Sequence, residues 1–194
     1  MSRLLYVVTH PEVEARADVA VPDWSLSELG RRRAQGLLQL DWVSAVRHVF
    51  SSSERKALET AELLAQTSGA GAVVVDPELG ENDRSATGFV PPTEFEQLAD
   101  QFFASPTQSV RGWETALDAQ QRIASAVERC LGQTTDGDVA IVCHGGVGTL
   151  LWCRLSGEVI DRRHDQPGQG SWYSVDLHTQ KPLGAWQRVP LPEP

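Results

Sequence analysis

The sequence predicts an α/β fold: a three-layer α/β/α sandwich with a mostly parallel central sheet and an antiparallel edge. Short apolar, β-branched segments alternate with amphipathic helical segments along most of the chain, and this alternation is typical of a parallel sheet with helices on both faces. Near the end, residues 171–177 and 184–189 read as two strands with no helix between them, which predicts the antiparallel edge. A length of 194 residues fits one domain covering residues 1–194.

The predicted strands before the edge are short apolar runs bounded by turn residues. Residues 4–8 form the first run, which stops before Pro11, and residues 45–50 form the second. Residues 72–75 form a weaker third run, and residues 138–143 form the clearest one in the chain. Continuous apolar runs of this length favour strands that are buried on both faces.

The helices are predicted from apolar residues at helical spacing and from capping signals. Residues 25–28 read as a capping box with Ser at the cap, and a second helix follows the serine run 51–53. Residues 91–96 resemble another capping box inside a loop-rich stretch. A long amphipathic helix is expected over 113–131, and an apolar helix follows from 145 to 156.

Composition and charge narrow the class of protein. The chain is 41% hydrophobic and 22% charged, with a net charge of −9. This balance argues against nucleic acid or an anionic membrane as a main partner, although a small anionic substrate in a locally basic pocket remains compatible with it. The arginine triplet 31–33 is expected to face solvent, and residues 190–194 to form a frayed tail.

Cysteine usage and the lack of long apolar segments predict a cytoplasmic protein. Cys130, Cys143 and Cys153 are the three cysteines, and an odd number without CxxC spacing disfavours a disulfide framework or a zinc site. Cys143 is expected in the core. We expect no secretory signal, and no apolar run reaches the ~18 residues that span a bilayer.

Several chemically active residues are predicted at the carboxyl ends of the strands, where ligands bind in open α/β sheets. His10 and His144 each follow a strand, and Glu81 follows the third strand region. A neutral imidazole can attack phosphorus, fixed cations can stabilise the phosphoryl oxygens, and a carboxylic acid can protonate the leaving oxygen. The set therefore points to phosphoryl transfer.

Five short motifs occur in a fixed order along the chain. They are Thr-His-Pro at 9–11, Trp-x-Leu-Ser-x-x-Gly at 24–30, Ser-Ser-x-x-x-Lys-Ala-x-x-Thr-Ala at 51–61, Leu-Gly-Glu at 79–81 and Cys-His-Gly-Gly at 143–146. Together they resemble the histidine phosphatase superfamily, which has the phosphoglycerate-mutase-like fold. The resemblance covers residues 4 to about 156.

The resemblance implies a role for each matching residue. His10 is the nucleophile that forms a phosphohistidine, His144 binds the transferring phosphoryl group, and Glu81 donates the proton to the leaving oxygen. Gly145 leaves room for the phosphate at a helix N-terminus. The implied reaction is hydrolysis of a small phosphate monoester by a monomer or homodimer without cofactor or metal. Mutase activity is less favoured, because it needs a pocket that keeps a phosphorylated intermediate for re-transfer.

The chain departs from the family where the family has phosphate-binding arginines. Thr9 replaces the arginine before the nucleophile, and Lys56 aligns with the second arginine, while Pro11 removes a backbone N–H. Arginine offers a planar fork that lysine lacks, and losing one such donor commonly costs about 10²–10³ in rate. The predicted phosphate-binding set is therefore Thr9, Arg55, Lys56, Arg16 and Gly145, with Arg84 and Arg111 on a lid over about 82–113.

Two alternatives stay open at this point. The first is a degenerate member of the family that binds a phosphorylated ligand or a protein partner without turnover. Thr9 and Lys56 favour this alternative, whereas the retained His10, Glu81 and His144 speak against it. A metal site of two histidines and a carboxylate is chemically allowed but lacks HExxH or any other local ligand spacing. No metal is expected.

Overall fold

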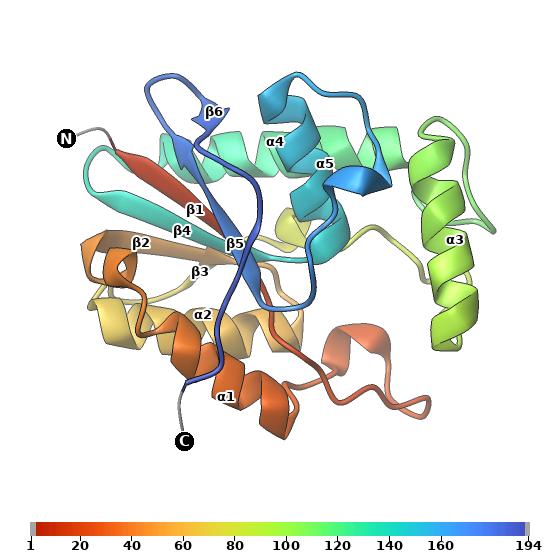
Figure 1. Ribbon diagram of the computed structural model, residues 1–194, viewed down its shortest axis with the longest axis horizontal. Coiled ribbons are helices and arrows are strands. Elements are labelled where there is room, and N and C mark those ends of the chain that lie inside the picture. Colours follow the sequence, from red (N-terminus) through yellow and green to blue (C-terminus); the bar gives the residue numbers. More distant parts are fainter. Residues whose placement is uncertain (1–2, 193–194) are drawn as a thin grey trace.

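A single mixed sheet forms the centre of the computed structural model, which describes residues 3–192 (Figure 1). Its order is β3-β2-β4-β1-β5-β6, with β7 also paired to β5. The pairs β1–β4, β4–β2 and β2–β3 are parallel, whereas β5 is antiparallel to β1, β6 and β7. The predicted mostly parallel sheet with an antiparallel edge is confirmed. The strands are β1 Leu4–Thr9, β2 Val46–Ser51, β3 Val74–Val75, β4 Asp138–Cys143, β5 Ser171–Asp176, β6 Lys181–Pro182 and β7 Gln187–Arg188.

The register of the parallel strands brings their carboxyl ends to one edge. Thr9 of β1 is opposite Cys143 of β4, so the residues that follow, His10 and His144, emerge side by side. Ser51 of β2 is opposite Val142 of the same central strand. Three chain segments that are far apart in sequence therefore deliver their next residues to the same place.

Helices cover both faces of the sheet (Figure 1). Helices α1 and α2 lie on one face, α4 and α5 lie on the other, and α3 lies beyond the carboxyl edge of the strands. This arrangement gives the predicted three layers. The helices are α1 Glu28–Leu37, α2 Arg55–Ser68, α3 Pro92–Ala104, α4 Ala116–Gly132 and α5 Gly145–Ser156, and the 3₁₀ turns are η1 Val21–Asp23, η2 Asp41–Ala45, η3 Pro77–Leu79 and η4 Arg162–His164.

Two apolar clusters form the core, one on each side of the sheet. The larger joins β1 and β4 to α3, α4 and α5, and includes Phe102, Trp113 and Ile123. The smaller joins the opposite strand faces to α2 and includes Val8 and Leu64. Burial of a side chain of this size contributes about 1.5–3 kcal/mol, so the clusters hold the strand ends firmly in place.

The structure corrects several predicted boundaries. The N-cap of α1 is Ser27, whose Oγ accepts from the Gly30 N–H at 3.1 Å, so the box does not begin at Ser25. Pro91 precedes α3 and its cap has no side-chain hydrogen bond, because proline offers no side-chain acceptor. The predicted last strand is also shorter, since 184–186 lie outside β7, and β6 was not predicted.

The arginine triplet and the tail differ from expectation as well. Arg33 is buried; its guanidinium pairs with Glu12 at 2.7 Å and donates to the Val189 carbonyl. The carbonyl of Pro190 packs against α1 so closely that a Cβ at Gly36 would lie 2.1 Å from it. This part of the tail is therefore docked rather than frayed, and residues 193–194 lie outside the described residues.

Cys143 is buried, as predicted, and the three cysteines are free thiols. Burial raises the pKa of Cys143 to about 12, so this thiol stays protonated at neutral pH. Within residues 3–192, none of the helices has the length and apolar character that a membrane span requires.

Candidate active site

His10 follows β1 with its ring buried at the sheet edge. Its Nδ1 lies 2.8 Å from the Pro11 carbonyl, which can only accept a hydrogen bond, so Nδ1 carries the proton and Nε2 carries the lone pair. Burial, and then the charge of Lys56, lower the pKa of His10 to about 4. At neutral pH the ring is therefore an uncharged imidazole whose Nε2 can act as a nucleophile.

The loop after His10 is held against the start of α1. The Glu12 carbonyl accepts from the Ser27 N–H at 2.9 Å. A Cβ at Gly30 would lie 2.0 Å from this carbonyl oxygen, so only glycine permits the contact. The motif at 24–30 thus has a local purpose: it fixes the backbone that follows the nucleophile.

His144 is fully buried beside His10, with their ring centroids 5.1 Å apart. Its Nε2 lies 2.8 Å from Ser52 Oγ and 3.2 Å from Glu54 Oε1. Its Nδ1 has no hydrogen-bond partner among the described residues. Burial lowers the pKa of His144 well below its ordinary value, so the ring is neutral at pH 7 and its Nδ1 is available to a ligand.

Glu54 is a partly buried carboxylate at the centre of this group, with a side-chain exposure of 13%. It forms an ion pair with Lys56, whose Nζ also donates to the Val21 carbonyl at 2.9 Å. Burial alone would raise the pKa of Glu54, but the charges of His144 and Lys56 lower it to about 2. Because His144 is neutral at pH 7, Lys56 is the charged partner there, and its positive charge is already balanced.

Glu81 lies against the first turn of α5. Its carboxylate oxygens accept from the N–H groups of Gly146 at 3.1 Å and Val147 at 3.0 Å. A Cβ at Gly146 would lie 2.7 Å from Glu81 Oε1, so this glycine makes room for the carboxylate. The Glu81 backbone is also fixed, because its N–H donates to Glu54 and its carbonyl accepts from Arg122.

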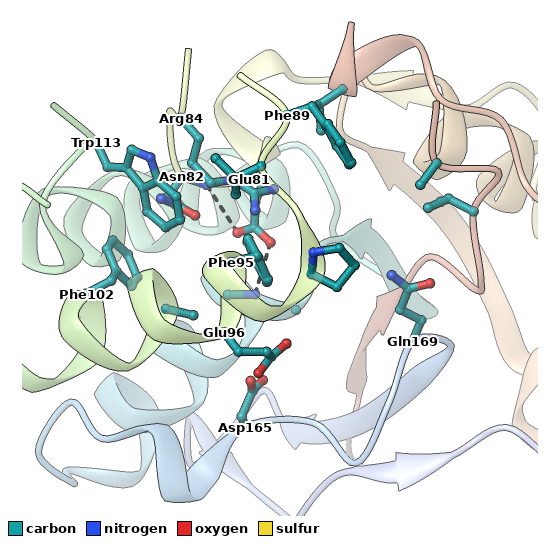
Figure 2. A pocket seen from close by; sticks show the side chains of 18 of the residues that line it. Glu81, Asn82, Arg84, Phe89, Phe95, Glu96, Phe102, Trp113, Asp165 and Gln169 are labelled. Carbon is teal, nitrogen blue, oxygen red and sulfur yellow. Dashed lines mark hydrogen bonds between the residues drawn. The ribbon is translucent and has the colours of Figure 1, made fainter. Parts of the chain in front are cut away.

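A cavity of about 330 Å³ opens over these groups (Figure 2), within the usual range for a small-molecule site. Aromatic side chains line one part of it, where Trp113, Phe102 and Phe95 lie near Arg84. The carboxylates of Glu96 and Asp165 face each other in another part. The lining includes His10, Lys56, Glu81, Asn82, Arg84, Phe89, Phe95, Glu96, Phe102, Trp113, Gly145, Gly146, Asp165, Gln166 and Gln169.

The structure brings most of the predicted site residues to this cavity. His10, Lys56, Glu81, Arg84 and Gly145 line it. The Arg84 guanidinium lies 4.9 Å from the Phe95 ring centroid and 5.6 Å from that of Trp113. Since no carboxylate among residues 3–192 pairs with this guanidinium, its charge is free for a ligand.

Three predicted arginines lie elsewhere, because each has a nearer carboxylate. Arg16 pairs with Asp18, Arg55 with Glu59 and Arg111 with Glu94, and all three are largely exposed. None of them lines the cavity. Arg16 and Arg55 were predicted to bind phosphate but lie outside the cavity in this structure, and Arg111, predicted on the lid, lies in that segment without reaching the cavity.

Thr9 and Gly145 are also placed differently from the expectation. Thr9 is buried and its hydroxyl bonds to Gln166 and Ser171, so it does not face the cavity. The open side of Gly145 holds the Gln166 amide, since a Cβ there would lie 2.3 Å from Nε2. The N–H groups of Gly146 and Val147 donate to the Glu81 carboxylate. Of the first turn of α5, the Gly145 N–H is left to donate to a ligand.

Sequence reasoning missed Glu54, Asp165, Gln166 and Arg122. Glu54 occupies a variable position of the motif at 51–61, although a carboxylate two residues before a buried lysine is a pairing signal. Burial raises the pKa of Asp165, whose Oδ1 accepts from Thr149 Oγ1 at 3.0 Å. Asp165 is therefore a second acidic group in the cavity.

No group of three or more histidine, cysteine or acidic side chains within residues 3–192 is arranged to hold a metal ion.

The model of the histidine phosphatase superfamily (branch 1) matches residues 5–187 of the chain. The chain belongs to the histidine phosphatase superfamily. The resemblance of the motifs is thereby confirmed.

Related sequences include mutase-like proteins. Phosphoglycerate mutase-like protein 4 of Arabidopsis thaliana is 28% identical over 161 residues, which cover 77% of this chain and 70% of that protein. The probable phosphoglycerate mutase GpmB of Proteus mirabilis is 28% identical over 159 residues, or 76% and 72% of the two chains.

Solved structures confirm the fold. A mycobacterial glucosyl-3-phosphoglycerate phosphatase superposes with a TM-score of 0.77 at 22% identity, over 96% of both chains. Bacillus stearothermophilus YhfR superposes with a TM-score of 0.72 at 25% identity, over 97% of this chain and 96% of that one. A putative alpha-ribazole-5'-P phosphatase from Escherichia coli gives 0.75 at 21% identity, over 99% and 100%.

Proposed function

We propose that this member of the superfamily is a phosphohydrolase that transfers the phosphoryl group of a small phosphate monoester to His10 and then to water. One observation carries the proposal: the neutral His10 imidazole, with its lone pair on Nε2, shares a cavity with the Glu81 carboxyl group and the free Arg84 cation. Structural neighbours described as phosphatases of glucosyl-3-phosphoglycerate and alpha-ribazole-5'-P support hydrolysis.

The reaction has two steps at one nitrogen. The His10 Nε2 lone pair forms the N–P bond while the P–O bond to the leaving group breaks. Glu81 enters this step as the carboxylic acid, gives its proton to the leaving oxygen and becomes the carboxylate. A water then gives its proton to the Glu81 carboxylate and forms a new P–O bond as the P–N bond breaks. Phosphate leaves, and both His10 and Glu81 return to their starting states.

His144 and Arg84 are the proposed partners of the phosphoryl oxygens. Because His144 Nε2 faces Ser52 and Glu54, its remaining nitrogen, Nδ1, is the one left for a ligand. Protonation of that nitrogen makes it a donor, and the Glu54 carboxylate on the other side of the ring stabilises the resulting imidazolium. Arg84 adds a second cation from the lid segment.

Several finer properties belong to the same proposal. Turnover is expected without a metal, because the Arg84 guanidinium supplies a positive charge at the cavity and His144 becomes a donor when its Nδ1 takes up a proton beside the bound phosphate. Mutase activity remains the less favoured reaction. A cytoplasmic location agrees with three buried free thiols, and the protein is expected to be a monomer or homodimer.

A second candidate is a binding protein without turnover. The observation that favours it is the ion pair between Glu54 and Lys56, which offsets the charge of the aligned cation in the phosphate-binding motif. Such a protein would bind a phosphorylated ligand or protein partner and leave it intact.

The test is a phosphatase screen with p-nitrophenyl phosphate and a metabolite panel in EDTA, run on the wild type and His10→Ala. Rapid mixing with ³²P-labelled substrate should give acid-labile, base-stable label on the wild type and none on His10→Ala. Label that survives this substitution would place the nucleophile elsewhere. Ligand binding without hydrolysis by either protein would favour the binding protein, and activity lost in EDTA and restored by zinc or magnesium would show a metal requirement.

A further inference from the structure

Thr9 occupies the position before the nucleophile, and its hydroxyl makes all of its hydrogen bonds to other residues of the protein. It donates to Gln166 Oε1 at 2.6 Å, with the Ser171 carbonyl a more distant acceptor at 3.2 Å. It also accepts from the Ser171 N–H at 3.0 Å. With a relative exposure of 1%, Thr9 does not contact a ligand itself, but it determines how Gln166 is oriented.

The Thr9 bond fixes which end of the Gln166 amide faces the site. Because Oε1 accepts from Thr9, the two hydrogens of Nε2 point away from it. Nε2 rests against Gly145, at the first residue of α5. In the part of the chain that the structure describes, no group accepts from Nε2, and Gln166 lines the cavity together with His10.

The segment that carries Gln166 is anchored on both sides. The Gln166 N–H donates to Asp165 Oδ1 at 2.7 Å, and the same oxygen accepts from Thr149 in α5. A few residues later, the Gly170 N–H donates to the His10 carbonyl at 2.9 Å. The amide is thus held in fixed relation to the nucleophile, which is what a group that stabilises developing charge requires.

We propose that Gln166 donates a hydrogen bond from Nε2 to the phosphoryl group in transfer to His10, and that Thr9 is the positioning residue that aims it. This inference rests on the proposed function and adds a residue to it. A neutral amide can donate to a phosphoryl oxygen without forming an ion pair with the Glu54 carboxylate, whereas a second cation at this place could pair with Glu54. The substitution of arginine by threonine at position 9 is then a replacement of one donor by another, rather than a simple loss.

The experiment combines hydrolysis of p-nitrophenyl phosphate with equilibrium binding of inorganic tungstate, a phosphate-like dianion. Gln166→Ala should lower kcat/KM about 10²-fold, the effect of one lost oxyanion donor, and weaken tungstate binding about tenfold. Thr9→Val should lower kcat/KM about tenfold, because the amide remains but loses its orientation. The double variant should be no worse than Gln166→Ala, since Thr9 acts through Gln166.

Thr134→Val is the matched control for Thr9→Val. It removes another buried hydroxyl, which donates to the Leu131 carbonyl just before β4, at the opposite end of the sheet. It should change the unfolding midpoint while leaving kcat/KM within about twofold, so a stability loss can be separated from an effect on the site.

Two results would overturn the inference. The first is a Gln166→Ala protein whose kcat/KM and tungstate affinity both stay within about threefold of wild type. The second is a double variant in which the losses from Thr9→Val and Gln166→Ala simply multiply. Because tungstate binding needs no turnover, it decides the role of Gln166 even where the wild type hydrolyses nothing, an outcome that would count against the proposed function alone.

Discussion

The two halves of the cavity are held by different kinds of contact. On the sheet side, His10 and His144 are buried and Glu54 is partly buried, and hydrogen bonds hold all three to groups beside the strand ends. On the side of the predicted lid, residues 82–113, Phe89 contacts Trp24 edge to face with ring centroids 5.9 Å apart. Helix α3 is joined to η4 by ion pairs of Arg162 with Glu96 and Asp100. The side chains of the first half are therefore held in one geometry, whereas the contacts of the second half can change without moving the side chains of the first.

This difference suggests that the sheet side carries out phosphoryl transfer and that the side of the predicted lid determines which substrates bind. Most groups proposed to contact the phosphoryl group lie at strand ends or in the first turns of helices, where the backbone is held in one geometry. Arg84 on the predicted lid and Gln166 in the loop before β5 are the exceptions. Among the described residues, the aromatic lid half makes no comparable set of hydrogen bonds with the proposed catalytic groups, so we expect it to bind the leaving group of the substrate. Substitutions on the two sides should therefore have different kinetic signatures.

The largest effect should come from Glu81 on the sheet side. Glu81→Gln is expected to slow hydrolysis of alkyl phosphates about 10²–10⁴-fold, because a poor leaving group needs the proton. Hydrolysis of p-nitrophenyl phosphate should fall far less, since p-nitrophenolate leaves unprotonated. Asp165→Asn is the comparison, because Asp165 is the other acid in the cavity. If Asp165→Asn alone shows the dependence on leaving group, Asp165 is the proton donor and the assignment to Glu81 is wrong.

The pH dependence of stability should report the buried histidines of the same half. Unfolded histidine takes up a proton near its ordinary pKa of 6.5, whereas burial holds the folded pKa of His10 at about 4. Between these values the unfolded state binds more protons, so stability falls as the pH falls from 6.5 towards 4. For His10 alone the loss is roughly 3 kcal/mol, and His144 acts in the same direction.

Urea unfolding at several pH values checks this sign. His10→Asn should show a shallower fall below pH 6.5 than the wild type, with the two curves parallel above pH 7. A wild-type protein that keeps its free energy of unfolding from pH 6.5 to 4.5 would show that these rings are not held neutral by burial.

A smaller effect is expected on the lid side. Phe89 is 40% exposed at the cavity rim, so Phe89→Ala should leave folding intact while removing apolar contact with the leaving group. KM for aryl phosphates should rise about tenfold with kcat unchanged, the signature of lost uniform binding. Glycerol phosphate, which is polar, should be hydrolysed as before. A fall in kcat for both substrates would mean that the lid also orders the catalytic groups.

The same division explains what the sequence could predict. His10, His144 and Glu81 follow strands or fall in short motifs, and parallel register brings strand ends together, so their meeting was predictable. Gln166 reaches the site through a contact with Thr9 across 157 residues of sequence, and no local pattern encodes such a contact. Arg33 was misjudged for a similar reason, because its partner Glu12 lies in a loop rather than on its own helix.

The smallest effect should come from the arginines that the structure places outside the cavity. Each of Arg16, Arg55 and Arg111 pairs with a carboxylate close by and is more than half exposed on its side chain, and exposed pairs of this kind contribute only about 0–1 kcal/mol. Alanine at any of the three should therefore keep kcat/KM within about threefold of wild type.

Arg84→Ala is the contrast, because Arg84 lines the cavity and carries an unpaired charge. This substitution should lower kcat/KM by about 10²-fold. Steady-state kinetics with p-nitrophenyl phosphate and thermal unfolding of all four variants would decide the matter. A tenfold loss in Arg16→Ala or Arg55→Ala at unchanged stability would mean that one of these side chains leaves its carboxylate when phosphate binds. The sheet side of the site would then be less rigid than its hydrogen bonds indicate.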